Sequence, residues 1–195
     1  MARKDFDLIT EWVEPDSRIL DLGCGDGSLL KLLNKKRNTS GYGVDTSIDK
    51  TIKSLDNTIN IINADINDHM DFFKDKSFDY VILAQSLQVV DNPVSLIKEM
   101  LRIGTEVIIS FPNMGYWRSR LYLFFRGEMP VTSELPFSWH STPNIHLCTI
   151  RDFKKMCISN NFQITEEVIN NVKGKNISAS LLNNLTGTSA IFRIK

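Results

Sequence analysis

Short apolar runs alternate with amphipathic stretches along the chain. The run at 80–84 is continuously apolar, as expected of a strand that is covered on both faces. Strand-like runs lie at 18–22, 40–45, 59–64, 80–84 and 106–111, and apolar residues at helical spacing lie at 6–13, 28–36 and 93–104. Strands that alternate with helices in this way predict an α/β fold with a doubly wound sheet and helices on both faces.

The remaining elements are predicted from caps and from shorter patterns. Residues 46–49 and 149–152 both read as capping boxes that open helices. Another short helix is expected near residues 68–73. Two closing strands, at 162–170 and 188–194, predict an antiparallel pair at the sheet edge. The expected sheet is therefore mostly parallel and seven-stranded.

Residues 114–144 interrupt the alternation. One side of a helix over about 115–126 carries Trp117, Leu121, Phe124 and Phe125, and the other carries Arg118, Arg120 and Arg126. Such a helix could lie on a membrane surface or bind a partner. The simplest interpretation is that it packs on the sheet as an ordinary amphipathic helix.

A long irregular segment with three prolines follows at 127–144. Loops of this length in a compact domain are often functional. Because this one comes after the fifth strand, we expect it to lie over the ligand-binding edge of the sheet as a lid.

Composition limits the range of functions. A length of 195 residues suits a single domain, which we expect to span 1–195 and to include the inserted helix and lid-like loop. The formal net charge is zero, which argues against a nucleic-acid partner held mainly by phosphate contacts. The three cysteines form neither a disulfide framework nor a zinc pattern, and no apolar run is long enough to span a membrane. Together with the lack of an apolar signal core near the N-terminus, these features indicate a cytoplasmic location.

A glycine turn follows the first predicted strand, at residues 21–27, and reads D-x-G-x-G-x-G. A strand that runs through such a turn into a helix provides a backbone cradle for acceptor-rich ligands. The spacing differs from the G-x-G-x-x-G of dinucleotide sites, and the P-loop sequence G-K-[ST] is missing. The turn instead resembles motif I of class I methyltransferases, which use S-adenosylmethionine (SAM).

Carboxylates stand at the ends of the first three strands. Asp45 follows Asp21 by 24 positions and Asp65 ends the third strand. An acidic residue about 20 positions after a glycine turn binds ribose hydroxyls in Rossmann-like sites. Asp65 is placed to accept a hydrogen bond from an adenine amine. Because the carboxyl ends of parallel strands meet at one edge, we expect a nucleoside site there.

Several stretches resemble the MetW family of methionine biosynthesis proteins. These are residues 21–30, 42–45, 78–83, 85–88, 110–113, 127–132 and 142–153, of which the last two are the most specific. The resemblance covers roughly residues 8–165. It is poor at 49–60 and 171–183, and Asp45 stands where the family often has Glu.

The resemblance implies a cytoplasmic protein with a Rossmann-like class I methyltransferase fold. It implies SAM as the bound cofactor, with S-adenosylhomocysteine as product or analogue, and a homoserine O-acyltransferase as the protein partner. Whether SAM is a methyl donor or a regulatory ligand stays open, and so does any small-molecule methyl acceptor. The expected cofactor-binding residues are Asp21, Gly23, Cys24, Gly25, Gly27, Asp45, Asp65, Ile66 and Gln85.

Candidates for catalysis are few. SAM is already activated, so a base is needed only when the acceptor must lose a proton. His146 is the first candidate for a base and His140 the second, although His146 could instead bond the loop backbone. Gln85 and Gln88 could bind substrate or cap a strand end. No metal site is expected.

Two functions remain open. One is a SAM-binding accessory protein that tunes an acyltransferase, and the other is an active methyltransferase on a small molecule or lipid. An exposed apolar patch on the helix at 115–126 would favour the first.

Overall fold

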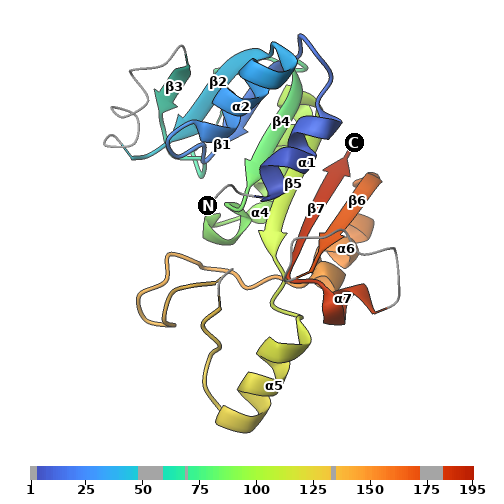
Figure 1. Ribbon diagram of the computed structural model, residues 1–195. Helices are drawn as coiled ribbons and strands as arrows, with labels where there is room; N and C mark the ends of the chain where they lie inside the picture. Colours follow the sequence, from blue (N-terminus) through green and yellow to red (C-terminus); the bar gives the residue numbers. More distant parts are fainter. Residues whose placement is uncertain (1–3, 48–58, 69, 133–134, 172–181) are drawn as a thin grey trace.

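One sheet organises the structure, which is a computed structural model that describes all residues except 1–3, 48–58, 69, 133–134 and 172–181 (Figure 1). The strand order is β3-β2-β1-β4-β5-β7-β6. The strands are β1 (Arg18–Leu22), β2 (Ser40–Asp45), β3 (Asn60–Asn63), β4 (Phe78–Ala84), β5 (Gly104–Pro112), β6 (Ile164–Asn170) and β7 (Ser189–Ile194).

The first five strands are parallel, and the last two are antiparallel to their neighbours. β7 pairs with β5 and with β6, so it lies between them. The chain order reverses between β1 and β4, which are adjacent in the sheet. In open α/β sheets ligands bind at such a switch point, outside the carboxyl ends of the strands. The predicted mostly parallel seven-stranded sheet is confirmed.

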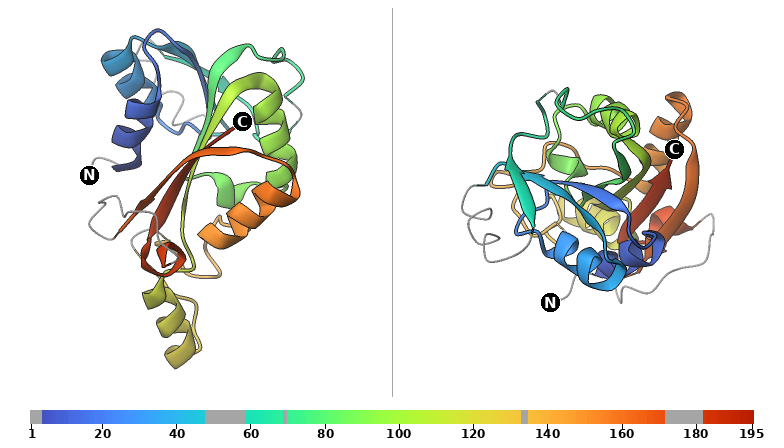
Figure 2. Two further views of the ribbon diagram at one scale, coloured as in Figure 1. Left: turned by 90° about the vertical axis from the view of Figure 1, so that its right-hand side faces the viewer. Right: turned by 90° about the horizontal axis from the view of Figure 1, so that it is seen from above.

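Helices cover both faces of the sheet (Figure 2). α1 (Lys4–Trp12) and α2 (Ser28–Arg37) pack on one face, where Ile9 and Leu33 contact a buried cluster with Ile19. α4 (Pro93–Ile103) and α6 (Ile150–Ser159) pack on the other face, where Ile97 and Phe153 belong to a second cluster. The shorter elements are η1 (Leu87–Val89), α5 (Trp117–Arg126) and α7 (Asn183–Thr186).

The helix caps follow from the sequence. The Asn92 side chain accepts a hydrogen bond from Ser95 N at the start of α4, and Pro93 takes the first helical position, which needs no N–H donor. The Thr149 side chain accepts from Asp152 N at the start of α6. The predicted capping box at 149–152 is therefore confirmed. The one at 46–49 falls partly outside the described residues.

The prediction of a helix near residues 68–73 is wrong. The described residues of this segment form isolated turns, closed by Asp68 N to Asp65 O (3.1 Å) and Phe73 N to Met70 O (3.0 Å). The Arg102 guanidinium on α4 donates to the backbone oxygens of Phe73 (2.9 Å) and Met70 (3.2 Å). A tertiary contact therefore satisfies carbonyl groups that a helix would use internally.

The interpretation that the 115–126 helix packs on the sheet is also wrong. α5 is helical as predicted, but it projects away from the sheet in both side views (Figures 1 and 2). Of its ten residues, Ser119 alone is buried. The helix begins after Tyr116 and ends at Gly127, which takes a left-handed conformation (φ 66°).

A cavity at the candidate cofactor site

The glycine loop is held by the end of β2. Gly23 N and Cys24 N both donate to Val44 O, at 2.8 and 3.1 Å. Gly25 N donates to Asp45 Oδ2 at 2.8 Å. These bonds fix the loop before any ligand arrives, so the site is preorganised.

Three glycines in the loop have positive φ, and two of them show why glycine is needed. A Cβ on Gly23 (φ 70°) would lie 2.6 Å from Ser86 Oγ, so the loop packs closely against the segment after β4. A Cβ on Gly25 (φ 59°) would meet nothing within 4 Å. Gly25 therefore faces open space, where a ligand can approach the backbone closely.

Asp45 links the loop to the next turn. Its Oδ2 accepts from Gly25 N, and its Oδ1 accepts from Ser47 N at 2.9 Å. The residue is buried. Because a carboxylate oxygen has two acceptor positions, each oxygen keeps one for a further donor. The carboxylate can thus order the loop and bind a ligand hydroxyl at the same time.

A cavity of about 430 Å³ lies beside this loop. Its volume falls within the range of roughly 300–1,000 Å³ that is typical of small-molecule sites. The lining residues come from the ends of β1, β2, β3 and β4, from η1 and from one distant loop: Gly23, Asp45, Thr46, Asp65, Ile66, Asn67, Gln85, Ser86, Val89 and Pro143.

The structure brings five of the nine expected cofactor residues to this cavity, namely Gly23, Asp45, Asp65, Ile66 and Gln85. The other four lie in or beneath the loop. Gly25 is bonded to Asp45, Gly27 caps α2, and Asp21 and Cys24 are buried. Burial raises the pKa of the Cys24 thiol, and the nearby Asp21 and Asp45 carboxylates raise it further. The thiol therefore stays protonated and is a packing group.

Gln85 has an unusual backbone at the end of β4. Its φ is +62°, which is uncommon for a residue other than glycine. Its N–H donates to Ser110 O (2.9 Å), and its Nε2 lies 3.4 Å from Ser110 Oγ. Ser110 Oγ in turn donates to Asp5 Oδ2 on α1 at 3.1 Å. A chain of polar contacts thus holds the Gln85 side chain at the cavity edge.

The two histidines lie elsewhere. His146 is exposed, and its Nε2 lies 3.3 Å from the backbone oxygen of Asp91. His140 is exposed next to Trp139. Gln88 is buried, and its backbone oxygen accepts from Ile145 N and His146 N at 2.8 and 3.0 Å. None of these three side chains is among the residues that line the cavity.

Sequence reasoning missed five lining residues: Thr46, Asn67, Ser86, Val89 and Pro143. Thr46, Asn67 and Ser86 each follow within two residues of a predicted site residue, so adjacency to the strand ends was an available signal. Pro143 comes from a segment far along the chain, and the lid expectation was the only indication of it. It is the one described residue of 114–144 that lines the cavity.

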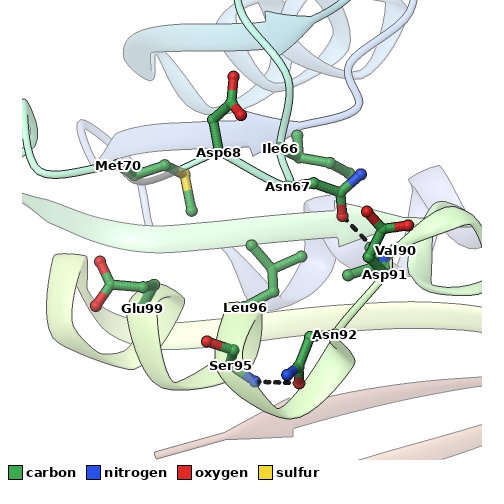
Figure 3. Close-up of a pocket in the computed structure, with 10 residues that line it drawn as sticks. All are labelled: Ile66, Asn67, Asp68, Met70, Val90, Asp91, Asn92, Ser95, Leu96 and Glu99. Carbon is green, nitrogen blue, oxygen red and sulfur yellow. Dashed lines mark hydrogen bonds between the residues drawn. The ribbon is translucent and has the colours of Figure 1, made fainter.

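A smaller pocket of about 100 Å³ lies next to this site (Figure 3). It shares Ile66 and Asn67 with the larger cavity, so the turn after β3 separates the two. Asn67 Oδ1 accepts from Asp91 N at 2.9 Å, which ties this turn to the start of α4. The second pocket lies between that turn and α4.

Within the described part of the chain, no helix is long and apolar enough to cross a membrane. No group of three or more His, Cys, Asp or Glu side chains there is placed to hold a metal ion.

The fold, with a cavity beside a glycine loop at the switch point, is that of the class I SAM-dependent methyltransferases. A solved SAM-dependent methyltransferase from Mesorhizobium loti superimposes with a TM-score of 0.71 at 14% identity, over 99% of this chain and 98% of that one. The plantazolicin methyltransferase BpumL, solved in complex with S-adenosylhomocysteine, gives 0.65 at 16% identity, over 98% and 80%.

The chain belongs to the MetW family, described as "Methionine biosynthesis protein MetW", whose sequence profile matches residues 3–194. A relative from Rhodopirellula baltica, the bifunctional methionine biosynthesis protein MetXA/MetW, is 36% identical over 197 aligned positions. The alignment covers 96% of this chain and 32% of the relative, so the chain spans about a third of that protein's length.

Proposed function

We propose that this protein binds SAM in the cavity of about 430 Å³ and that the SAM-bound form tunes a homoserine O-acyltransferase of methionine synthesis. The observation that carries the proposal is the relative that joins MetXA, the homoserine acetyltransferase, and MetW in one chain. Two proteins that are fused in one organism often act together in others. SAM is a chemical product of methionine, so its binding would report the state of the pathway.

The residues around the cavity fit SAM. Asp45 keeps free acceptor positions for the ribose hydroxyls, and Asp65 is exposed beside Ile66, where an adenine ring would meet one polar and one apolar group. Gly25 leaves open space over the loop for the methionine portion. Bound SAM would supply an activated methyl group; the chain's own residues bind and orient the molecule.

The described lining of the cavity is suited to binding a nucleoside. Its described lining contains no histidine, lysine, cysteine or tyrosine. The two carboxylates in it, Asp45 and Asp65, are the ones that fit the nucleoside. His146 would have to leave its contact with Asp91 O to act as a base. Among the described lining residues, an acceptor that must lose a proton would therefore find only these two carboxylates.

The test is the rate of the homoserine O-acyltransferase from the same organism, measured alone and with this protein over a series of SAM concentrations. We expect the rate to change when the protein is added and to change again as SAM saturates it. The Asp45→Ala variant should still change the rate when it is added. The further change caused by SAM should then require a higher SAM concentration.

An identical rate under all conditions would contradict the proposal. Release of S-adenosylhomocysteine with a small-molecule or lipid acceptor, without any effect on the acyltransferase, would instead support an independent methyltransferase.

A further inference from the structure

α5 exposes an apolar surface that nothing in the described chain covers. Six of its ten residues are aromatic or aliphatic and 40–79% exposed, and we define them as the α5 surface: Trp117, Leu121, Tyr122, Leu123, Phe124 and Phe125. Phe124 and Phe125 are the most exposed, at 79% and 75%. Their rings contact each other edge to face, with centroids 5.1 Å apart, and form one continuous apolar tip.

The arrangement of these residues indicates that a groove on another protein covers the α5 surface. Residues 121–125 are apolar without a break, so they cover more than a full turn of the helix. A helix on a membrane surface needs one polar face, and a spanning helix needs about 20 residues. α5 has ten residues; Arg118 and Arg120 lie in its first turn and Arg126 ends it, so the run 121–125 between them carries no charged side chain on any face. A helical turn that is apolar on every side, as at 121–125, is stabilised when another protein encloses it.

The loop after α5 extends the exposed apolar area. Its exposed apolar side chains, 38–76% accessible, are Met129, Val131, Phe137, Trp139, Ile145 and Leu147. Interfaces are enriched in Trp, Phe, Tyr, Met and Arg. Both α5 and this loop have that composition.

We propose that the α5 surface is the docking site for the homoserine O-acyltransferase and inserts into an apolar groove on that enzyme. This inference rests on the proposed function. The choice of partner over a second copy of this chain follows from the relative that carries MetXA and MetW together, because fusion keeps the two parts permanently adjacent.

Charge further defines the partner surface. Arg118 and Arg126 are exposed at the two ends of α5, whereas Arg120 Nε donates to Gly115 O at 2.6 Å. The Arg118 guanidinium lies 5.3 Å from the centre of the Trp117 ring. The groove that fits this helix is apolar at its base and carries carboxylates at its rim.

The same segment reaches the cofactor cavity, which gives docking a route to the bound ligand. Met114 N donates to Cys148 O at 3.0 Å, so the chain leaves the sheet after β5 and returns before α6 at one place. We call residues 113–115 and 148–150, which meet there, the neck. Asn113 Oδ1 accepts from Gly115 N and Ile150 N on the two sides of that neck. Pro143 then lines the cavity, and the next residues bond to η1. A partner that shifts this segment would therefore change the affinity for the ligand, and the effect must be reciprocal.

The test compares the double variant Phe124→Ser, Phe125→Ser with the wild-type protein and with Ile158→Ser. Ile158 is a matched control, because it is 76% exposed but lies on α6, outside the α5 surface. Binding to the purified acyltransferase is measured by calorimetry, and SAM binding to each free variant checks that the fold is intact. We expect roughly 30-fold weaker docking for the double variant, the loss typical of a central aromatic hot spot, and unchanged docking for Ile158→Ser.

The outcomes separate the two proposals. If the wild-type protein fails to bind the acyltransferase, the proposed function falls and this surface falls with it. If the wild-type protein and the double variant bind equally well, the surface assignment alone is overturned. Loss of self-association in the double variant, seen by light scattering without the acyltransferase and with docking unchanged, would assign the surface to a second copy. Binding to anionic lipid vesicles that the double variant loses, again with docking unchanged, would assign it to a membrane.

Discussion

At the scale of single residues, Asp45 connects the glycine loop to the ligand space. Its two oxygens accept from Gly25 N and Ser47 N, each keeps a second acceptor position, and the residue lines the cavity. One side chain therefore shapes the cradle and contributes to binding. A second feature at this scale is the set of three thiols, of which Cys24 and Cys157 are buried and Cys148 is half-buried, and burial raises the pKa of each.

Asp45→Ala is expected to weaken SAM binding by about 1–3 kcal/mol, because a hydrogen-bonding partner is lost from a buried site. Calorimetric titration with SAM measures this. Asp75→Asn is the matched control. Asp75 is exposed, pairs with Arg102 and precedes β4, so it lies at the amino ends of the parallel strands, away from the cavity. Equal affinities for the wild type and Asp45→Ala would contradict the ribose assignment.

The thiol of Cys157 should make stability fall at high pH. Burial raises its pKa from 9.0 to about 11. A raised folded-state pKa gives stability that is fully present below pH 9 and is lost as the pH rises toward 11, because the unfolded chain ionises first. Urea unfolding between pH 7 and pH 10 should therefore show a loss that is about 1.4 kcal/mol smaller in Cys157→Ala than in the wild type. Parallel losses in both proteins would refute this reasoning.

Part of the site was predictable from the sequence at this scale. Asp45, Asp65 and the glycines were found because they stand directly at strand ends, where local pattern and site coincide. Pro143 was not named, because a residue that reaches the cavity from a distant loop leaves no local signal, and only the lid expected at 127–144 pointed to its segment. The hydrogen bond that Gly25 N donates to Asp45 Oδ2 was not predicted either, because the sequence does not show which side chain reaches the loop backbone.

At the scale of elements, α5 is the feature that sets this chain apart from a minimal fold. Its helical pattern was predicted, but periodicity does not say what a helix packs against, and the helix projects into solvent. The segment 68–73 shows the same limit, because Arg102 on another element takes its carbonyl groups. At 68–73 a tertiary contact overrules the local preference, whereas α5 forms as predicted and only its surroundings could not be inferred from its own residues.

Asn113 holds the neck from which α5 projects. Its Nδ2 donates to Asn184 O and Gly187 O, and its Oδ1 accepts from Gly115 N and Ile150 N, all at 2.8–3.2 Å. Asn113→Ala would leave several buried backbone groups without partners, and we expect it to lower the free energy of unfolding by about 3 kcal/mol.

Urea denaturation checks this prediction. Asn92→Ala, which removes an exposed helix cap, serves as control with an expected cost of about 1 kcal/mol. If the free energy of unfolding falls by the same small amount in both variants, the neck does not depend on Asn113.

At the scale of the whole molecule, the alternation of strands and helices was sufficient to predict the architecture. The position of β7 between β5 and β6 was not predictable, because apolar alternation does not specify which neighbours a strand takes. The sheet places the cavity at its switch point, and the excursion between β5 and α6 carries the α5 surface away from it. One neck joins the two regions, so ligand and partner act on a shared segment.

The central claim is that SAM and the homoserine O-acyltransferase bind to one molecule and influence each other. The most direct measurement is the affinity for SAM by calorimetry, with the acyltransferase absent and then at saturation. We predict a change of roughly 5-fold or more, matched by an equal change in acyltransferase affinity when SAM is varied. Identical SAM affinities in the two conditions, or no SAM binding in either, would contradict the account.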